Sequence, residues 1–261
     1  MKKSLEVGTV AGLLLGCGAI FGSFLLEGGK MGALFLGPAM IIVFGGTFGA
    51  LLLASPTKLV VSLPKFVMVA VMPSKEDARE LIETIVGYAT TVRKHSLLSL
   101  EKELPKIENP FLRRILSFAI DGMDPGTIRS VAETELAYIG ERHSANQALF
   151  SKMGGYSPTM GVIGTVMGLI STLANAGGDA NDLIHHIASA FIATLWGVFA
   201  ANIVYLPLGD KLKAIHQEEA MAMELMVEGV LSIQSGEAPA ITRAKLESML
   251  PSSQQGQANK K

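Results

Sequence analysis

The hydrophobic residues of the chain gather in four long windows, which are separated by polar segments of very different length. The windows cover residues 7–26, 33–54, 156–176 and 186–209, and none of them contains Asp, Glu, Lys or Arg. A helix rises about 1.5 Å per residue, so roughly 20 apolar residues cross the hydrocarbon core of a membrane. The pattern therefore predicts four transmembrane helices in an all-α integral membrane protein.

The windows occur as two pairs, and each pair is joined by a short connection at residues 27–32 or 177–185. A long polar segment separates the pairs, and a polar tail follows the second pair. Helical spacing of apolar residues indicates that both polar regions are largely helical. We expect four parts: transmembrane helices 1 and 2 in residues 1–54, a large helical cytoplasmic insertion in 55–155, transmembrane helices 3 and 4 in 156–209, and a helical tail with a disordered end in 210–261.

The basic residues predict the orientation in the membrane. Only Lys30 lies in one of the two short connections. Loops rich in Lys and Arg stay in the cytoplasm, so both termini and the insertion are expected there. The basic residues near the window ends agree with this orientation: Lys2, Lys3, Lys58, Lys65, Lys152, Lys211 and Lys213.

The N-terminus has some features of a secretory signal. MKK precedes an apolar run, and LLGC at residues 14–17 loosely resembles a lipoprotein cleavage box. The apolar run nevertheless continues beyond Cys17 to Leu26, with no polar segment directly behind the cysteine. We therefore expect the first span to be retained.

Helix boundaries in the polar regions are marked by capping residues and prolines. Pro73 and Ser74, with Asp77 three residues on, predict the start of an amphipathic helix that extends to about His95. Proline is favoured in the first turn of a helix. Further helices are expected to begin at Pro110, to begin at Pro125 and lead into the third window, and to cover residues 212–234.

Composition and charge exclude some classes of protein. The chain has 261 residues, of which 49% are hydrophobic and 17% charged, with a mean hydropathy of +0.40. A net charge of -1 argues against a nucleic-acid binder, which needs a basic surface. Cys17 is the single cysteine, so neither an internal disulfide nor a thiolate metal cage can form. The polar end SSQQGQANKK is expected to be disordered.

Small residues in the first two windows are expected to pack helix against helix. Gly residues let helix backbones approach each other in lipid. The first window has two Gly pairs with a spacing of four, and the second has a cluster: Gly12, Gly16, Gly18 and Gly22, then Gly45, Gly46, Gly49 and Ala50.

The third and fourth windows each carry small residues, a threonine and a proline on one helix face. Thr165 and Thr194 fall near mid-depth, whereas Pro158 and Pro207 fall toward the cytoplasmic side. A lone membrane threonine usually bonds its own helix backbone, but two at similar depth favour a polar pathway. The stripes are Pro158, Gly161, Thr165, Gly168 and Thr172 in one window, and Ala190, Thr194, Gly197 and Ala201 in the other.

The four windows contain no carboxylate. A hydroxyl can coordinate a cation or order water, but it does not titrate near neutral pH. Conduction of H⁺ or Na⁺ usually relies on an intramembrane carboxylate. Either the chain transports no ion, or another polypeptide supplies the acid.

Several separated motifs in this sequence resemble one family. YSPTMGVIGTVMGL and AFIATLWGVFAANIVYLPLGDKLK, in a chain with two spans, a large insertion and two more spans, are similar to the MotA family of flagellar motor stator subunits, within the MotA/TolQ/ExbB superfamily. RKHSLLSLEKEL and NPFLRRILSFAIDG in the insertion, and MVEGVLSIQSGEAP in the tail, look like the same family. The resemblance covers nearly the whole chain.

The resemblance implies a function and a set of partners. MotA-type subunits form a homo-oligomeric ring in the bacterial plasma membrane around a pair of MotB-type subunits, whose transmembrane helix carries the ion-binding aspartate. Ion flow would drive the ring, and charged cytoplasmic residues would push on the rotor protein FliG, which links the chain to motility and chemotaxis. The missing carboxylate then belongs to the partner. No enzymatic activity and no cofactor besides the driving ion are implied.

The resemblance also carries roles onto residues of the spans. Pro158 and Pro207 match the two prolines that couple ion flow to rotation. Thr194 matches the threonine that faces the partner aspartate, and Thr165 would share the ion pathway. These four residues form the membrane part of the expected site.

Three charged residues of the insertion match residues that engage the rotor. Arg93 and Glu101 match the basic and acidic residues of the family, and Lys94 is a neighbouring basic candidate. Without the resemblance, a solvated helix end is the better interpretation, because exposed charges contribute little to stability.

The driving ion is expected to be H⁺. Sodium-driven relatives tend to have a threonine in span three and a threonine pair in span four, whereas this sequence has Thr165 but Ala193-Thr194. Fewer oxygen ligands weaken a Na⁺ site. Thr165 keeps Na⁺ open as an alternative.

Three other classes of protein were weighed. An ExbB or TolQ type subunit would have three spans, and a secondary transporter would need a polar substrate site within its own spans. A membrane-bound enzyme would need a catalytic set, which the scattered histidines do not form. His185 and His186, beside Asp182, are expected to be a pair in the loop at the membrane edge rather than a metal site.

Overall fold

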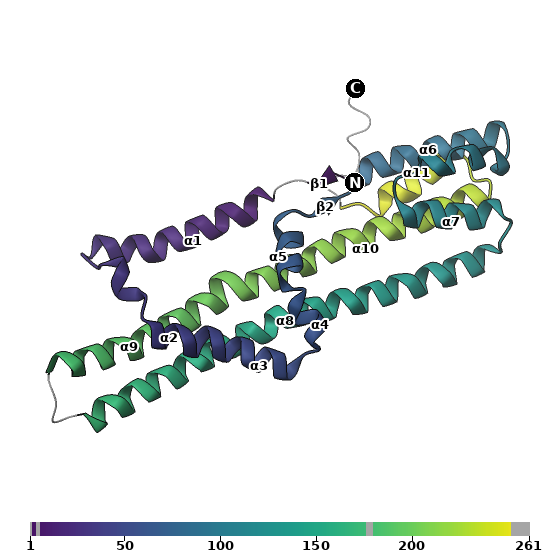
Figure 1. Ribbon diagram of the computed structural model, residues 1–261. Coiled ribbons are helices and arrows are strands. Elements are labelled where there is room, and N and C mark those ends of the chain that lie inside the picture. The colour runs from purple at the N-terminus through teal and green to yellow at the C-terminus, as the bar shows by residue number, and fades with distance from the viewer. Residues whose placement is uncertain (1, 4–5, 176–179, 252–261) are drawn as a thin grey trace. The chain divides into compact units, whose positions relative to one another are not determined.

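The computed structural model describes residues 2–3, 6–175 and 180–251, and these residues are mainly helical (Figure 1). Four of the helices in the described part are long and apolar enough to cross a membrane, which confirms the predicted all-α class and the four spans. The polar end of residues 252–261, expected to be disordered, lies outside the described residues. The helices are α1 (Val7–Leu26), α2 (Gly37–Met40), α3 (Gly46–Ala54), α4 (Thr57–Val61), α5 (Leu63–Val71), α6 (Ala78–Lys94), α7 (Pro110–Ile120), α8 (Pro125–Ala174), α9 (Ala180–Phe199), α10 (Leu206–Gln234) and α11 (Pro239–Ser248).

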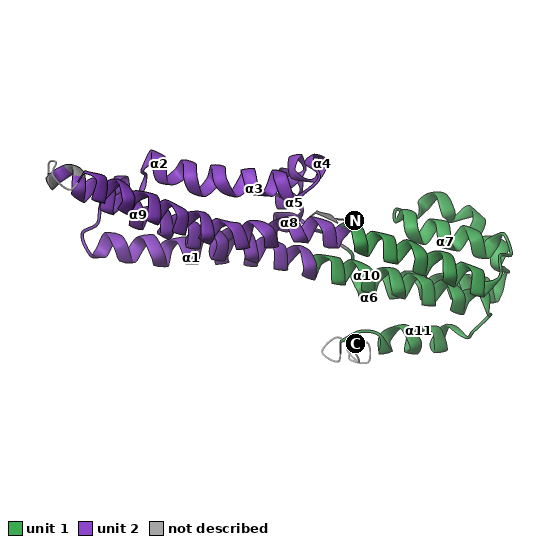
Figure 2. Ribbon diagram, turned by 90° about the horizontal axis from the view of Figure 1, so that it is seen from below, with its two compact units in different colours: residues 1–4, 74–142, 215–261 green, residues 5–73, 143–214 purple. Residues whose placement is uncertain are grey.

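The chain folds into two compact units, coloured separately in Figure 2. Unit 1 comprises Met1–Ser4, Ser74–Arg142 and Ile215–Lys261, and unit 2 comprises Leu5–Pro73 and His143–Ala214. Helices α8 and α10 each contribute part of their length to both units. The expected insertion began at residue 55 and ended at 155, but its two ends group with the spans in unit 2.

Two of the spans are interrupted by π-helical turns. Residues Ile41–Gly45 lie between α2 and α3, and Ala200–Tyr205 lie between α9 and α10. Pro207 follows the second of these turns and cannot donate a backbone hydrogen bond, so the local widening of the helix matches the missing donor. Pro158, by contrast, lies inside α8 without ending it.

Helix α6 begins later than the sequence predicted. Its N-cap is Asp77, whose carboxylate accepts a hydrogen bond from the Arg79 backbone N–H at 2.9 Å. Ser74 does not cap the helix, because it lies in the short strand β2 (Ser74–Lys75), which pairs antiparallel with β1 (Lys2–Lys3). The predicted end is confirmed, since His95 is the C-cap residue.

The two helices expected to begin at proline do so. The Asn109 side chain accepts hydrogen bonds from the Phe111 and Leu112 backbone N–H groups at 2.9 and 3.1 Å, and Pro110 is the first residue of α7. Asp124 accepts from the Thr127 backbone N–H at 3.1 Å, just before α8 begins. Both caps satisfy N–H groups that have no partner inside the helix.

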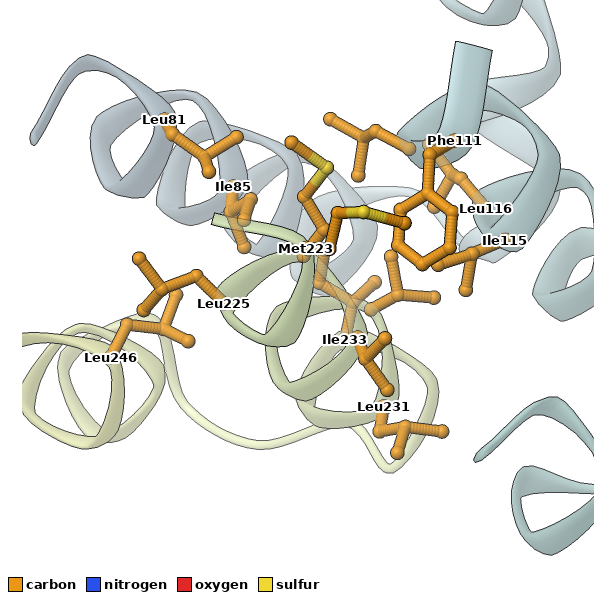
Figure 3. Close-up of a cluster of buried hydrophobic side chains, with 14 of the residues drawn as sticks. Leu81, Ile85, Phe111, Ile115, Leu116, Met223, Leu225, Leu231, Ile233 and Leu246 are labelled. Carbon is orange, nitrogen blue, oxygen red and sulfur yellow. The ribbon is translucent and has the colours of Figure 1, made fainter. Parts of the chain in front are cut away.

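The core of unit 1 is formed where α6, α7, α10 and α11 bury their apolar faces together, as Figure 3 shows. Ile85 and Leu116 are fully buried, and a Cβ atom at Gly229 would lie 2.6 Å from the Ile85 side chain. Each large aliphatic side chain buried in this way contributes about 1.5–3 kcal/mol to stability. The labelled members of the cluster are Leu81, Ile85, Phe111, Ile115, Leu116, Met223, Leu225, Leu231, Ile233 and Leu246.

A charged network also ties the helices of unit 1 together. Glu228 on α10 pairs with Arg129 at 2.6 Å and with Lys245 at 3.1 Å. Burial alone would raise the pKa of the Glu228 carboxyl, but the hydrogen bonds and charges of these two cations outweigh it, so the pKa lies below its ordinary value. The ionised form of Glu228 is therefore stabilised by folding.

Glu228→Gln is expected to lower the free energy of unfolding at pH 7 by about 1–2 kcal/mol, a figure reduced for partial solvent exposure. A carboxyl whose pKa is lowered by folding contributes stability above the pKa of the unfolded state, and this contribution is lost as the pH falls through the folded pKa. The difference from the unsubstituted protein should therefore shrink under acidic conditions. Thermal unfolding of the two purified proteins, at pH 7 and under acidic conditions, measures this difference in stability. Glu224→Gln, on the exposed side of α10, is the control.

Most of the glycines in the first two spans do not pack against another helix of the chain. A Cβ atom at Gly16 would lie 3.4 Å from the Ile203 side chain, and one at Gly46 would lie 2.7 Å from Met160. The others have open space around the Cβ position and contact no other helix within the described chain, so their expected packing stays a prediction: Gly12, Gly18, Gly22, Gly45 and Gly49.

Trp196 on α9 joins three of the spans in unit 2. Its indole N–H donates a hydrogen bond to the Leu34 carbonyl oxygen at 2.8 Å. The ring also lies within an aromatic cluster that draws on α1, the segment around α2, and α9 itself: Phe21, Phe35, Phe44 and Phe199.

Two lysines bind groups at the ends of helices in unit 2. The Lys152 ammonium donates to the Ala54 carbonyl oxygen at 2.6 Å and to the Ser55 hydroxyl at 3.0 Å, so it satisfies the C-terminus of α3. Lys211 forms an ion pair with Glu6 at 2.8 Å, immediately before α1 begins.

Candidate functional site

The two predicted stripes of small residues face each other along a seam between α8 and α9. A Cβ atom at Gly161 would lie 2.9 Å from the Ala193 carbonyl oxygen and 3.1 Å from the Thr194 Cα. A Cβ atom at Gly197 would lie 2.7 Å from the Ser157 carbonyl oxygen. These distances leave no room for a side chain, so the two backbones are in direct contact. We call this contact the α8–α9 seam.

The two threonines of the predicted ion pathway meet at the middle of the seam. The hydroxyl groups of Thr165 and Thr194 form a hydrogen bond with each other. The Thr165 hydroxyl also lies 3.0 Å from the Ala190 carbonyl oxygen and 3.1 Å from the Gly161 carbonyl oxygen. Both side chains are half-buried. The structure thus brings together the two hydroxyls and adds two carbonyl oxygens that the sequence did not single out.

The two prolines lie at different places along unit 2. Pro158 is half-buried in α8, two turns before Thr165, and it has no N–H to offer the Gly154 carbonyl one turn earlier. Pro207 is exposed near the start of α10. Each proline interrupts the regular backbone hydrogen bonding of a long helix. Long helices bend at such interruptions.

Two further polar groups of the seam escaped sequence reasoning. The Ser157 side chain is fully buried, and its hydroxyl has no hydrogen-bond partner among the described residues. The His186 Nδ1 atom is buried and lacks a partner in the same part of the chain. The signal was present in the spacing, because Ser157 precedes Thr165 by eight residues and His186 precedes Thr194 by eight, so each lies on its threonine's helix face.

The prediction that the two neighbouring histidines lie in a loop is wrong. His185 and His186 both lie in α9, which begins at Ala180. Consecutive helical residues point in different directions, and accordingly the His185 side chain is exposed whereas His186 is half-buried. The side chain of the neighbouring Asp182 lies outside the described residues.

The three charged candidates lie in unit 1. Arg93 and Lys94 occupy the last turn of α6, where cations are favourable beside the carbonyl end of a helix. Glu101 lies in the 3₁₀ turns Leu97–Lys102, which the fully buried Leu100 anchors to the core. All three side chains are exposed, and none forms an ion pair within the part of the chain that the structure describes. They are therefore available to another molecule.

Comparison with known proteins decides the family. Residues 10–96 match the description Motility protein A N-terminal, and residues 103–225 match the MotA/TolQ/ExbB proton channel family. Motility protein A of Bacillus subtilis (strain 168) is 34% identical over 244 residues, which cover 93% of this chain and 90% of that protein. The chain belongs to the MotA family. This family consists of ion-channel subunits and is not an enzyme family.

Solved structures of MotA-family complexes share the fold. The structure of C. jejuni MotAB matches with a TM-score of 0.90 and 26% identity, covering 97% of this chain and 100% of that chain. The flagellar MotAB stator complex from Bacillus subtilis matches with a TM-score of 0.88 and 34% identity, covering 94% and 96%. The MotA-family resemblance read from the sequence is therefore confirmed.

Proposed function

We propose that this chain is the A-type subunit of a flagellar stator, which couples ion flow across the plasma membrane to torque on the rotor. One observation carries the proposal: the α8–α9 seam holds two paired hydroxyls, while the four apolar windows contain no Asp, Glu, Lys or Arg. A pathway of hydroxyls needs a titrating group to move protons. A MotB-type subunit would supply it as an aspartate on its transmembrane helix.

The partner and the oligomeric ring are supported by the relatives, since both matched structures are described as MotAB. In this arrangement the chain would form a homo-oligomeric ring around a pair of MotB-type subunits. Within the described chain α1 has no buried residue, which fits a helix that faces lipid or a neighbouring subunit. The basic residues at the window ends support a plasma-membrane orientation with both termini in the cytoplasm.

Torque would pass along the long helices that connect the ion-pathway residues with the charged residues expected to contact the rotor. Thr165 and Thr194 lie in unit 2, whereas Arg93, Lys94 and Glu101 lie in unit 1, and α8 contributes to both units. Pro158 and Pro207 would let the helices bend when the state of the partner aspartate changes. The exposed charges would then act on FliG, the rotor protein.

H⁺ is the proposed driving ion. The Ala193 side chain packs toward Gly164, where a Cβ atom would lie 2.6 Å from the Ala193 Cβ, so the residue beside Thr194 offers no oxygen ligand. A proton needs only the partner carboxylate and water. Na⁺ is the second candidate, because Thr165, Thr194 and the Ala190 carbonyl place three oxygen atoms together.

The function is tested by measuring ion flux into membrane vesicles that contain this chain alone or with a MotB-type partner. We expect proton flux only when the partner is present, and none when its membrane aspartate is replaced by asparagine. Flux that requires Na⁺ in place of H⁺ would select the second candidate. Flux through the chain alone would contradict the assignment of the titrating group to the partner.

Arg93→Glu is expected to reduce motility several-fold while the stator still assembles in the membrane. The side chain is exposed and unpaired within the described chain, so reversing its charge costs the fold little but turns an attractive contact with an acidic rotor residue into a repulsive one. Swimming speed and co-purification with the partner measure the two effects. The control is Arg113→Glu, an equally exposed charge reversal on α7. Loss of assembly in Arg93→Glu would indicate a structural role instead.

A further inference from the structure

His186 occupies the end of the α8–α9 seam that lies farthest from Pro158 and Pro207. A Cβ atom at Gly168 would lie 3.2 Å from the His186 carbonyl oxygen and 2.8 Å from the Ala190 Cβ, so this end of the seam is as closely packed as its middle. His186 lies one helical turn from Ala190 and two from Thr194, about 12 Å from Thr194 along the helix axis. Its backbone therefore borders the seam about two helical turns from Thr194.

The position is unusual in its chemistry. Imidazole is the side chain that ordinarily changes charge between pH 5 and 8, and His186 is the only histidine in the four apolar windows. The neighbouring segments of α9 carry no charge: α2 and the turn Ile41–Gly45, which pack against this helix, and residues 156–174 of α8 contain no Asp, Glu, Lys or Arg. Asp182, one turn earlier on α9, is the nearest acidic residue on its own helix.

The hydrogen bonding of His186 is incomplete. Its Nδ1 atom is buried and has no partner within the described chain, although a buried polar atom left unpaired costs about 1–3 kcal/mol. Three buried side-chain atoms share this property in the described residues, and two of them, His186 Nδ1 and Ser157 Oγ, lie on the seam. Unpaired buried polar atoms in native proteins commonly mark functional positions or sites of bound water.

We propose that His186 is a proton-relay residue at the outer end of the seam, passing protons from the outer aqueous phase toward the level of Thr165 and Thr194. This inference rests on the proposed stator function. The imidazole takes a proton from hydronium, so an O–H bond breaks and an N–H bond forms. The N–H bond then breaks, the proton passes through water to the carboxylate of the MotB-type partner, and the imidazole is neutral again.

The relay assigns the two histidines different roles. His185 is exposed and takes no part, whereas His186 supplies a half-buried imidazole, a group that can accept and release a proton. Because a hydroxyl neither stores nor releases a proton near neutral pH, a relay that begins at an imidazole would collect protons more often than one that begins at a threonine. His186 would therefore set the rate at which the partner carboxylate is protonated from outside.

The test uses the assembled complex of this chain with its MotB-type partner in vesicles, with proton flux followed by a trapped pH indicator from pH 5 to 8. His186→Gln keeps a side chain of similar size that can form hydrogen bonds but cannot carry a proton. We expect it to lower the flux about tenfold and to change how the flux depends on the outer pH. His185→Gln is the matched control and should behave as the unsubstituted complex does.

Chemical rescue separates a relay from a structural role. Imidazole added to the outer buffer should restore flux in His186→Gln, because a small diffusible base can replace the missing one, but it should not rescue a misfolded complex. Unchanged flux and pH profile in His186→Gln, or a loss that imidazole does not restore, would overturn the relay while the stator function stands. If the unsubstituted complex fails to conduct at all, the stator function itself falls, and the relay with it.

Discussion

Thr194→Val is expected to reduce ion flux and swimming at least tenfold while the chain still inserts and assembles. Valine has nearly the shape of threonine but lacks the hydroxyl, so it removes the hydrogen bond between Thr194 and Thr165 and leaves the packing against Gly161 in place. Loss of one positioned polar group along a proton pathway typically costs about 10²-fold or more in rate. Swimming speed and proton flux through the partner complex measure the effect.

The matched control for this substitution is Thr159→Val. The Thr159 hydroxyl donates only to the Tyr156 carbonyl oxygen of its own helix, at 2.7 Å, and the side chain is exposed. The same chemical change there should leave motility close to normal. Normal swimming in Thr194→Val would remove this residue from the ion pathway, and loss of the assembled complex would indicate that its hydroxyl serves packing alone.

Gly161→Val is expected to prevent the seam from forming and so to abolish motility. The new Cβ atom would lie 2.9 Å from the Ala193 carbonyl oxygen and 3.1 Å from the Thr194 Cα, and both are backbone atoms that cannot rotate away. Overpacking of this kind typically costs about 1–3 kcal/mol. It would also move Thr194 away from Thr165. We expect a lower unfolding temperature of the purified protein and little assembled complex.

Gly155→Val provides the comparison, because it lies on the same helix with nothing within 4 Å of its Cβ position. Valine and glycine differ in helix propensity by only a few tenths of a kcal/mol, so this change tests the propensity without the clash. Equal effects of the two substitutions would show that glycine is needed in α8 for flexibility rather than for close contact with α9.

All of these experiments depend on the proposal that the partner subunit supplies the intramembrane carboxylate. Both threonines, the two prolines and His186 lie in unit 2, and the four apolar windows contain no carboxylate. The proposed mechanism therefore requires a second polypeptide, and each substitution acts on how protons reach or leave that partner. Thr194→Val and His186→Gln should differ in one respect, since a soluble base should rescue only the second.

Capping residues predicted the start of a helix correctly where the backbone N–H groups of the first turn bond the neighbouring side chain. Asn109 and Asp124 cap α7 and α8 because their short side chains reach the free N–H groups of the first turn. The same reasoning placed the cap of α6 at Ser74, and this was wrong. Ser74 pairs with the N-terminal strand instead, and Asp77 takes its place. Pairing with a distant strand cannot be read from a local pattern.

The glycines show the same limit in the membrane. Gly12 and Gly161 both belong to series with helical spacing, yet only Gly161 contacts another helix of this chain. Spacing shows which residues share a face, but it does not show which face a second helix covers. The MotA-family resemblance pointed to Thr194, whereas the spacing of Ser157 and His186 gained meaning only once their burial was known.

The sequence by itself determined that this protein has four apolar spans and that the four apolar windows hold no carboxylate of their own. These properties depend on composition and on helical periodicity, which are local. Only the tertiary structure decided that the two stripes of small residues close on each other, that Thr165 bonds Thr194, and that the backbone of His186 lies beside Gly168. Such contacts depend on how two helices approach, and residues far apart in the chain settle that approach together.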